Sequence, residues 1–214
     1  MPRCLITSGP TREYLDPIRY LSNGSSGRMG AALAEALLAI GWDVTIVSGP
    51  VPTAYPPAAT VVPVVSTDEM RAAAEGVWPA CDGLFAAAAP CDFRPRRVAS
   101  TKLKKTGAGL TLDLEETPDV VAGLIRVRRP RQWVVAFALE THQGRHHALQ
   151  KLRVKRCDWI VLNAAEAINA DRTEVEMIDR GGATVYHRHG PKAEVAAGLV
   201  GIATKGPSGG DGGG

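Results

Sequence analysis

Two groups of residues have the types and spacing to bind phosphate. The first is the run Ser22-Asn23-Gly24-Ser25-Ser26-Gly27, which leads directly into a helical pattern. Glycines let an anion approach the backbone, and the N–H groups and positive dipole end of a helix N-terminus attract phosphate. The second group is basic, because Lys151 and Lys155 lie four residues apart on one face of a predicted helix. We expect these cations to converge on one small polyphosphate.

Further candidates lie between these two groups. Asp92 follows an alanine-rich predicted strand, and ligands of open α/β sheets bind at the carboxyl ends of such strands. Asp92 is therefore a candidate ligand of Mg²⁺ or of a nucleotide. Its neighbour Cys91 has no evident base, so we do not expect a nucleophile there. In Lys102-Leu103-Lys104-Lys105, strand-like alternation predicts that Lys102 and Lys104 point to one side.

The elements that must position these residues alternate between strands and helices, which predicts a parallel sheet. Apolar runs predict strands over 5–8, 44–47, 61–65, 84–89, 133–139 and 159–162. Helical spacing and caps predict helices over 26–40, 67–77, 117–126 with Thr117 as N-cap, 144–156 and 192–204. Gly181-Gly182 predicts a hairpin between 174–178 and 184–187. The expected fold class is α/β, with a doubly wound, mainly parallel Rossmann-like sheet.

Two segments do not fit this alternation. One is the irregular stretch from about Gly9 to Ser25, and the other is Lys102 to Leu114. The second predicts a two-stranded β-ribbon that protrudes from the sheet as a flap over about 96–114. The Gly/Ser tail over 206–214 cannot bury surface and is expected to be disordered, which leaves one domain over 1–205.

The charge of the chain is unevenly distributed. The 214 residues carry a formal net charge of +3, but 94–156 holds 15 lysines and arginines against five acids, a net +10, which leaves −7 for the rest. An anionic ligand is therefore expected at this middle segment. The four cysteines form no CxxC pair, and no apolar run approaches the roughly 18 residues of a membrane span. We expect buried reduced thiols, no membrane segment and a cytoplasmic location.

The residues alone leave other functions open. An NAD(P)-binding Rossmann oxidoreductase also has glycines after its first strand, but here the second predicted strand ends in Ser48-Gly49-Pro50 instead of the acid that binds the ribose. The basic clusters over 126–131 and 151–156 could contact nucleic acid. Helix-turn-helix spacing and aromatic stacking platforms are missing from the sequence, so we expect no nucleic-acid partner. A nucleotide-binding protein without catalytic activity also stays open.

A series of motifs between residue 5 and about 165 resembles one known family. The most specific is the block from Asp16 to Gly27, which reads Asp-Pro-x-Arg-x-x-Ser-Asn-x-Ser-Ser-Gly. The others lie in the same order as in that family, at 6–13, 25–30, 92–95, 102–105, 117–119, 136–141, 151–155 and 160–163. The family is phosphopantothenoylcysteine synthetase (phosphopantothenate–cysteine ligase), the synthetase domain of the bifunctional coenzyme A biosynthesis flavoproteins.

The resemblance implies a ligase that joins 4'-phosphopantothenate to L-cysteine through an acyl-nucleotide intermediate, with release of pyrophosphate from CTP or ATP. It also implies Mg²⁺ on the triphosphate, for which Asp92 at its strand end is the candidate protein ligand, and no flavin. Family members dimerise through extra strands, so a homodimer is expected. Because the chain begins at the synthetase strand, we expect a separate protein to perform the decarboxylation that follows in the pathway.

The resemblance also implies roles for single residues. By carry-over, Asn23 stabilises or turns over the intermediate, Arg19 meets phosphopantothenate or the partner protomer, and Lys102 on the flap assists the chemistry. Gly24, Ser25, Ser26 and Gly27 are implied to bind substrate phosphate. The implied nucleotide-binding residues are Ala88, Asp92, Lys102, Pro118, Asp119, Val120, Val121, Phe137, Lys151 and Lys155. Pro10 and Pro90-Cys91 depart from the family pattern and leave open whether the site is fully active, because Pro10 removes one N–H from the anion loop and Pro90 alters the turn before Asp92. The sequence also leaves the choice between CTP and ATP open.

Overall fold

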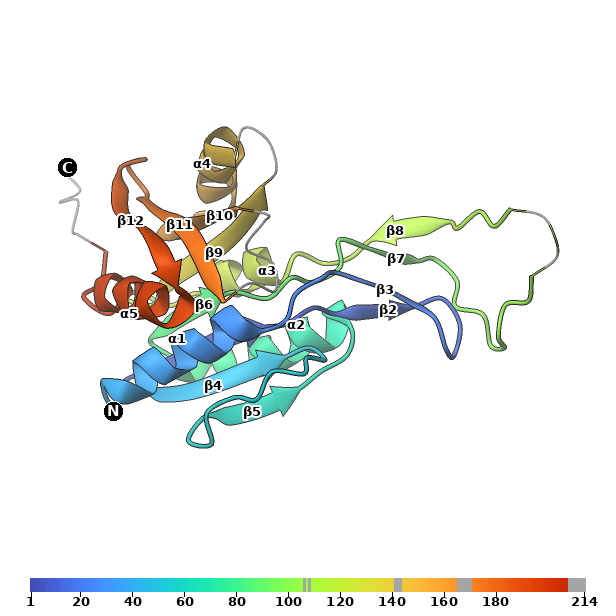
Figure 1. Ribbon diagram of the computed structural model, residues 1–214, viewed down its shortest axis with the longest axis horizontal. Helices are drawn as coiled ribbons and strands as arrows, with labels where there is room; N and C mark the ends of the chain where they lie inside the picture. The colour runs from blue at the N-terminus through green and yellow to red at the C-terminus, as the bar shows by residue number, and fades with distance from the viewer. Residues whose placement is uncertain (106, 108, 141–143, 165–170, 208–214) are drawn as a thin grey trace.

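The computed structural model describes residues 1–105, 107, 109–140, 144–164 and 171–207. Its centre is an eight-stranded sheet with the order β12-β11-β10-β9-β6-β1-β4-β5 (Figure 1). The strands are β1 (Arg3–Ser8), β4 (Asp43–Ser48), β5 (Thr60–Pro63), β6 (Gly83–Ala86), β9 (Trp133–Glu140), β10 (Trp159–Ala164), β11 (Arg172–Asp179) and β12 (Thr184–Pro191). Strands from β5 to β10 pair in parallel, and the predicted hairpin β11–β12 is antiparallel. The doubly wound, mainly parallel sheet is thus confirmed.

Helices cover both faces of the sheet. On one face lie α1 (Arg28–Ala39) and α5 (Lys192–Ala203), and on the other lie α2 (Thr67–Val77), α3 (Val120–Arg126) and α4 (Gly144–Lys155). A short 3₁₀ helix, η1 (Trp78–Ala80), follows α2. The helices start and end within about three residues of the predicted bounds, because apolar spacing and local capping set them.

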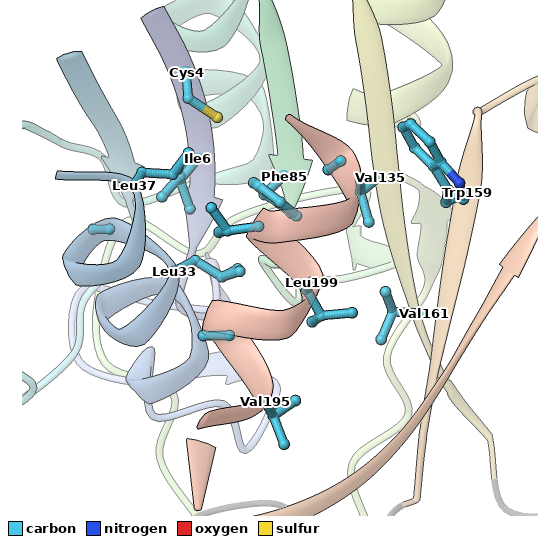
Figure 2. Packing of buried hydrophobic residues seen from close by; sticks show 14 of the residues in the cluster. Cys4, Ile6, Leu33, Leu37, Phe85, Val135, Trp159, Val161, Val195 and Leu199 are labelled. Carbon is cyan, nitrogen blue, oxygen red and sulfur yellow. The ribbon is translucent and has the colours of Figure 1, made fainter. Parts of the chain in front are cut away.

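The central strands are apolar on both faces because helices bury both. In β1, Cys4 and Ile6 pack toward α1 and α5, whereas Leu5 packs toward the opposite layer. Figure 2 shows the core between the sheet and the helices α1 and α5. The helices contribute Leu33, Leu37, Val195 and Leu199, which pack against the strand residues Ile6, Phe85, Val135 and Val161. Each fully buried side chain of this size contributes about 1.5–3 kcal/mol by leaving water. This packing holds the carboxyl ends of the strands in one rigid edge.

A two-layered arm extends away from the sheet (Figure 1). It consists of the antiparallel pairs β2 (Arg12–Tyr14) with β3 (Tyr20–Ser22) and β7 (Phe93–Pro95) with β8 (Leu114–Glu116), and β2 lies beside β7. The β2–β3 pair lies inside the stretch that the sequence left irregular. The residues that pair in β2 and β3 show no alternation of apolar and polar side chains, so the sequence did not predict these strands.

The predicted flap needs one correction. Its paired strands, β7 and β8, lie at the base, and the described residues between 96 and 113 form no strand. The expected strand-like alternation at Lys102 and Lys104 is therefore wrong. Adjacent lysines and the glycines at 107 and 109 have low strand propensity, and extended backbone needs a partner strand to satisfy its hydrogen bonds.

The remaining expectations concern thiols, membrane segments and the tail. All four cysteines are buried and free, which confirms the prediction of buried reduced thiols. Burial raises the pKa of Cys81 and of Cys157 to about 11. Within the described residues, no helix has the length and apolar character needed to cross a membrane. Most of the tail predicted to be disordered, 208–214, lies outside the described residues.

Candidate active site

A cavity of about 750 Å³ lies at the carboxyl ends of β1, β6, β9 and β10. The strand order reverses between β1 and β6, and open α/β sheets bind ligands at this switch point. Its walls are residues 23–30, 86–93, 116–121 and 136–139, together with Lys151, Lys155, Ile160, Asn163 and Lys192. The fold thus brings together the predicted site residues Asn23, Gly24, Ser25, Ser26, Gly27, Ala88, Asp92, Pro118, Asp119, Val120, Val121, Phe137, Lys151 and Lys155. Arg19 and Lys102 lie elsewhere.

Hydroxyl groups from other segments form hydrogen bonds to backbone carbonyls of the loop before α1. The Thr53 hydroxyl donates to the Ser26 carbonyl at 2.6 Å, and the Ser8 hydroxyl donates to the Gly27 carbonyl at 3.4 Å. Gly27 has φ +76°, a conformation that side chains disfavour. At Gly30, an added Cβ would lie 2.1 Å from Ser8 Oγ, so glycine lets α1 start directly against β1.

The N-terminus of α1 faces the cavity. Gly27 is its N-cap, and no side chain of the described residues caps the first turn. Backbone N–H groups and the positive end of the helix dipole are therefore directed toward a bound ligand. This geometry agrees with the predicted phosphate loop at 24–27, whose role stays a prediction.

Asn23 joins two walls of the cavity. Its side-chain Nδ2 donates to the carbonyl oxygens of Ala89 at 3.1 Å and of Pro90 at 2.9 Å. These carbonyls belong to the loop that connects β6 to β7. Asn23 therefore holds its amide at the point where the loop after β1 meets the loop after β6.

The loop that carries Asp92 is fixed by a buried hydrogen-bond cluster at Cys91. The Cys91 N–H donates to Thr11 Oγ1 at 2.8 Å, and Thr11 Oγ1 lies 2.8 Å from Thr67 Oγ1. The Thr117 hydroxyl donates to the Cys91 carbonyl. Burial raises the pKa of the Cys91 thiol, which supports the expectation that Cys91 is not a nucleophile. Asp92 itself is exposed at the cavity wall.

The opposite wall combines α3 and α4. Asp119 is the N-cap of α3, since its Oδ1 accepts a hydrogen bond from Ala122 N at 3.0 Å. The prediction of Thr117 as the cap is wrong, because the Thr117 hydroxyl is directed to Cys91 instead. Lys155 Nζ lies 3.1 Å from Asp119 Oδ2, and both Lys151 and Lys155 line the cavity, as their shared helix face predicts. This wall presents ammonium groups and the N-terminal backbone of α3 to the cavity, and its role in nucleotide binding stays a prediction.

Arg19 and Lys102 belong to the arm and do not line this cavity. Buried Asp16 links them, because its carboxylate accepts from the Arg19 guanidinium and, at 3.0 Å, from Leu103 N. Arg19 also donates to the Leu103 carbonyl at 2.9 Å. Burial raises the pKa of Asp16, but the backbone N–H groups of Arg19, Ile18 and Leu103 lower it more, so the pKa lies well below the usual range. The side chain of Lys102 is thus exposed, whereas the backbone of the next residue, Leu103, is held by hydrogen bonds to Asp16 and Arg19.

The structure adds cavity residues that the sequence predictions missed. Asn163 lies at the end of β10 and accepts a hydrogen bond from Thr173 Oγ1 at 2.6 Å, and its place after a parallel strand is a signal that could have identified it. Lys192 and Arg28 also line the cavity. No local signal marks Lys192, because the antiparallel return of β12 brings the start of α5 to this edge.

The carboxyl end of β4 differs from a dinucleotide site. Ser48 Oγ is 2.7 Å from the Tyr55 hydroxyl, which donates to Ser8 Oγ at 2.9 Å. An added Cβ at Gly49 would lie 1.6 Å from the Pro10 carbonyl oxygen. The end of β4 therefore carries hydroxyl groups and a glycine, and not the acid that holds the ribose in a Rossmann dehydrogenase.

Comparisons with known proteins agree with this geometry. The chain is 39% identical over 192 residues to the coenzyme A biosynthesis bifunctional protein CoaBC of Bacillus subtilis (strain 168), which covers 89% of this chain and 46% of that protein. The chain thus spans about half the length of the curated relatives it matches. The crystal structure of the C-terminal domain of a CoaBC protein superposes with a TM-score of 0.80 at 33% identity, over 95% of this chain and 96% of the other.

A more distant structure shares the fold. A Cab2 mutant in complex with phosphopantothenate-cysteine has a TM-score of 0.78 at 16% identity, over 95% of this chain and 87% of that one. The family model for the DNA/pantothenate metabolism flavoprotein C-terminal domain matches residues 2–205. The chain therefore belongs to the family of DNA/pantothenate metabolism flavoprotein C-terminal domains, and it is similar to the C-terminal domain of CoaBC.

Proposed function

We propose that the chain is a phosphopantothenate–cysteine ligase of coenzyme A biosynthesis. The observation that carries this proposal is that one cavity collects both parts of the predicted site. The loop at 24–27 suits a phosphorylated acid, and the wall with Asp119, Lys151 and Lys155 suits a nucleotide. Membership of the CoaBC family supports the same reaction.

In the first step, a carboxylate oxygen of 4'-phosphopantothenate bonds to the α-phosphorus of CTP or ATP. The bond from that phosphorus to the bridging oxygen breaks, and pyrophosphate leaves with the added negative charge. Lys151 and Lys155 can stabilise this charge from fixed positions, since Lys155 is held by Asp119 at 3.1 Å. The N-terminus of α1 and its loop at 24–27 hold the phosphate of 4'-phosphopantothenate in this proposal.

In the second step, the cysteine amine bonds to the acyl carbon, and the nucleoside monophosphate leaves. The amine proton passes to the departing phosphate. The acyl oxygen gains charge in between, and a fixed amide donor lowers the energy of such an oxyanion. We propose Asn23 as this donor. Both hydrogens of its Nδ2 are donated to the carbonyl oxygens of Ala89 and Pro90, so a bond to the oxyanion replaces one of these two bonds.

Mg²⁺ fits this cavity as a partner of the triphosphate. Among the described residues, no three His, Cys, Asp or Glu side chains gather into a metal cluster. Mg²⁺ is commonly held by one or two carboxylates together with substrate phosphates and water. We propose Asp92 as its protein ligand, and bound Mg²⁺ would offset the charge of the triphosphate. Flavin has no part in the proposed reaction.

The arm supports a homodimer. Exposed apolar side chains occupy it, namely Ile18, Tyr20, Phe93, Val98, Leu110 and Leu112. We propose that side chains of this set form the contact between protomers, since apolar groups gain free energy when a partner covers them. Lys102 and Arg19 do not line the cavity of their own chain. We therefore propose that in the dimer their side chains reach the cavity of the partner protomer. Sedimentation at micromolar concentration tests this, and a monomer at that concentration contradicts it.

A pyrophosphate-release assay tests the ligase. We expect release that requires 4'-phosphopantothenate, Mg²⁺ and either CTP or ATP, with one triphosphate preferred. Omitting 4'-phosphopantothenate is the control for simple hydrolysis. If neither triphosphate yields pyrophosphate, the proposed function is wrong, and binding of CTP or ATP without release would indicate a non-catalytic nucleotide-binding protein.

A further inference from the structure

The cavity has a second cationic end, distinct from Lys151 and Lys155. Lys192 is the first residue of α5 and Arg28 the first of α1, and both line the cavity. These helices cover the face of the sheet opposite to α4. The cavity therefore carries cations on both sides of the sheet edge, one pair on each.

Lys192 lies in a buried position close to the charge of Arg28. Lys192 is only 8% exposed. Burial lowers its pKa, the nearby charge of Arg28 lowers it further, and Asp171 acts in the opposite direction. The Asp171 carboxylate is 91% exposed and accepts a hydrogen bond from Arg28 at 2.7 Å, so its charge is shared and solvated. An anion in the cavity would relieve the repulsion between the two cations.

We propose that Lys192, together with Arg28, binds a phosphoryl group of a substrate on the α1 and α5 side of the cavity. The inference rests on the proposed function, in which two phosphorylated substrates bind at once. Lys151 and Lys155 on α4 can bind the phosphates of one substrate. Arg28 and Lys192 can then bind a phosphoryl group of the second substrate. The phosphoryl group belongs either to 4'-phosphopantothenate or to the β,γ-phosphates of the triphosphate.

The test compares Lys192→Met with wild-type protein by equilibrium binding of four probes: 4'-phosphopantothenate, pantothenate, CTP and CMP. Loss of one charge-assisted hydrogen bond predicts about 10- to 100-fold weaker binding of one phosphorylated probe. If 4'-phosphopantothenate weakens and pantothenate does not, Lys192 binds the 4'-phosphate. If CTP weakens and CMP does not, Lys192 binds the β,γ-phosphates. ATP and AMP replace CTP and CMP if the enzyme prefers ATP.

Controls separate this role from a structural one. Lys205→Met removes an exposed lysine beyond the end of α5 and is expected to bind all probes like wild type. Thermal unfolding of Lys192→Met should give one cooperative transition, which shows that the variant is folded when the probes are compared. Lys192→Arg keeps the charge and should restore part of the lost affinity.

Two results would overturn the proposal. One is unchanged binding of all probes by Lys192→Met, and the other is equal weakening of all four, which indicates a general disturbance of the cavity. Failure of the ligase assay in wild-type protein would refute the proposed function instead. The binding comparison still decides the role of Lys192 in that case, because it needs no turnover.

Discussion

The hydrogen-bond cluster at Thr11 allows a quantitative prediction. Thr11 is fully buried, accepts from Cys91 N at 2.8 Å and lies 2.8 Å from Thr67 Oγ1. Thr11→Val keeps the shape of the side chain but removes the hydroxyl. The Cys91 N–H then loses its acceptor in a buried place, which costs about 1–3 kcal/mol of the free energy of unfolding. For a protein of this size the melting temperature should fall by about 2–12 °C.

The same change should affect the site, because the cluster positions the residue before Asp92. We expect a raised KM for the triphosphate in Thr11→Val, measured by pyrophosphate release beside urea and thermal unfolding. Thr11→Ser is the matched control, since it keeps the hydroxyl and should retain most of the stability and the KM. This role of the Thr11 hydroxyl is refuted if the free energy of unfolding of Thr11→Val lies within about 0.5 kcal/mol of the wild-type value, as for neutral surface changes. It is also refuted if Thr11→Ser loses as much stability as Thr11→Val.

Three further substitutions test the arm and the cavity. Lys102→Ala should lose most turnover and keep the wild-type melting temperature, because Lys102 is exposed; normal turnover would remove Lys102 from the site. Asn23→Asp should accumulate the acyl nucleotide, detected by mass spectrometry, and a normal rate without intermediate would contradict that role. Asp16→Asn should lower turnover, because it frees Leu103 and hence Lys102 from their anchor. The lowered pKa of Asp16 means that its contribution to stability is complete above the unfolded pKa of about 3.9 and is lost as pH falls below it toward the folded pKa. The difference in unfolding free energy between wild type and Asp16→Asn should therefore stay constant from pH 7 to 5 and shrink only in stronger acid; a difference already lost at pH 6 would argue against the anchor.

Much of the fold could be predicted because its signals are local. Runs of buried residues such as 5–8 and helical spacing such as 28–39 report burial directly, so strands and helices could be located and a parallel sheet inferred. The strands of the arm could not be predicted in this way. Its strands β2, β3, β7 and β8 have three residues each, and pairs this short are defined by their partners and not by a pattern.

The candidate site divides in the same way. Asn23, Asp92, Lys151 and Lys155 could be predicted because each follows a strand end or shares a helix face, or belongs to a family motif. Lys192 could not, since a cation at the start of a helix usually lies in solvent. Only the return of β12 to the sheet edge buries it beside Arg28.

By itself, the sequence determined the alternating α/β order, the phosphate-type loop before the first helix, the basic middle segment and the family. These features depend on neighbours within a few residues or on motifs in a fixed order. The tertiary structure alone decided that the predicted residues share one cavity, that Lys102 and Arg19 lie outside it on an arm, and that Asp16 ties Arg19 to Leu103. The physical reason is that a residue's contacts across the sheet edge depend on strand order and packing, which pair segments far apart in the chain.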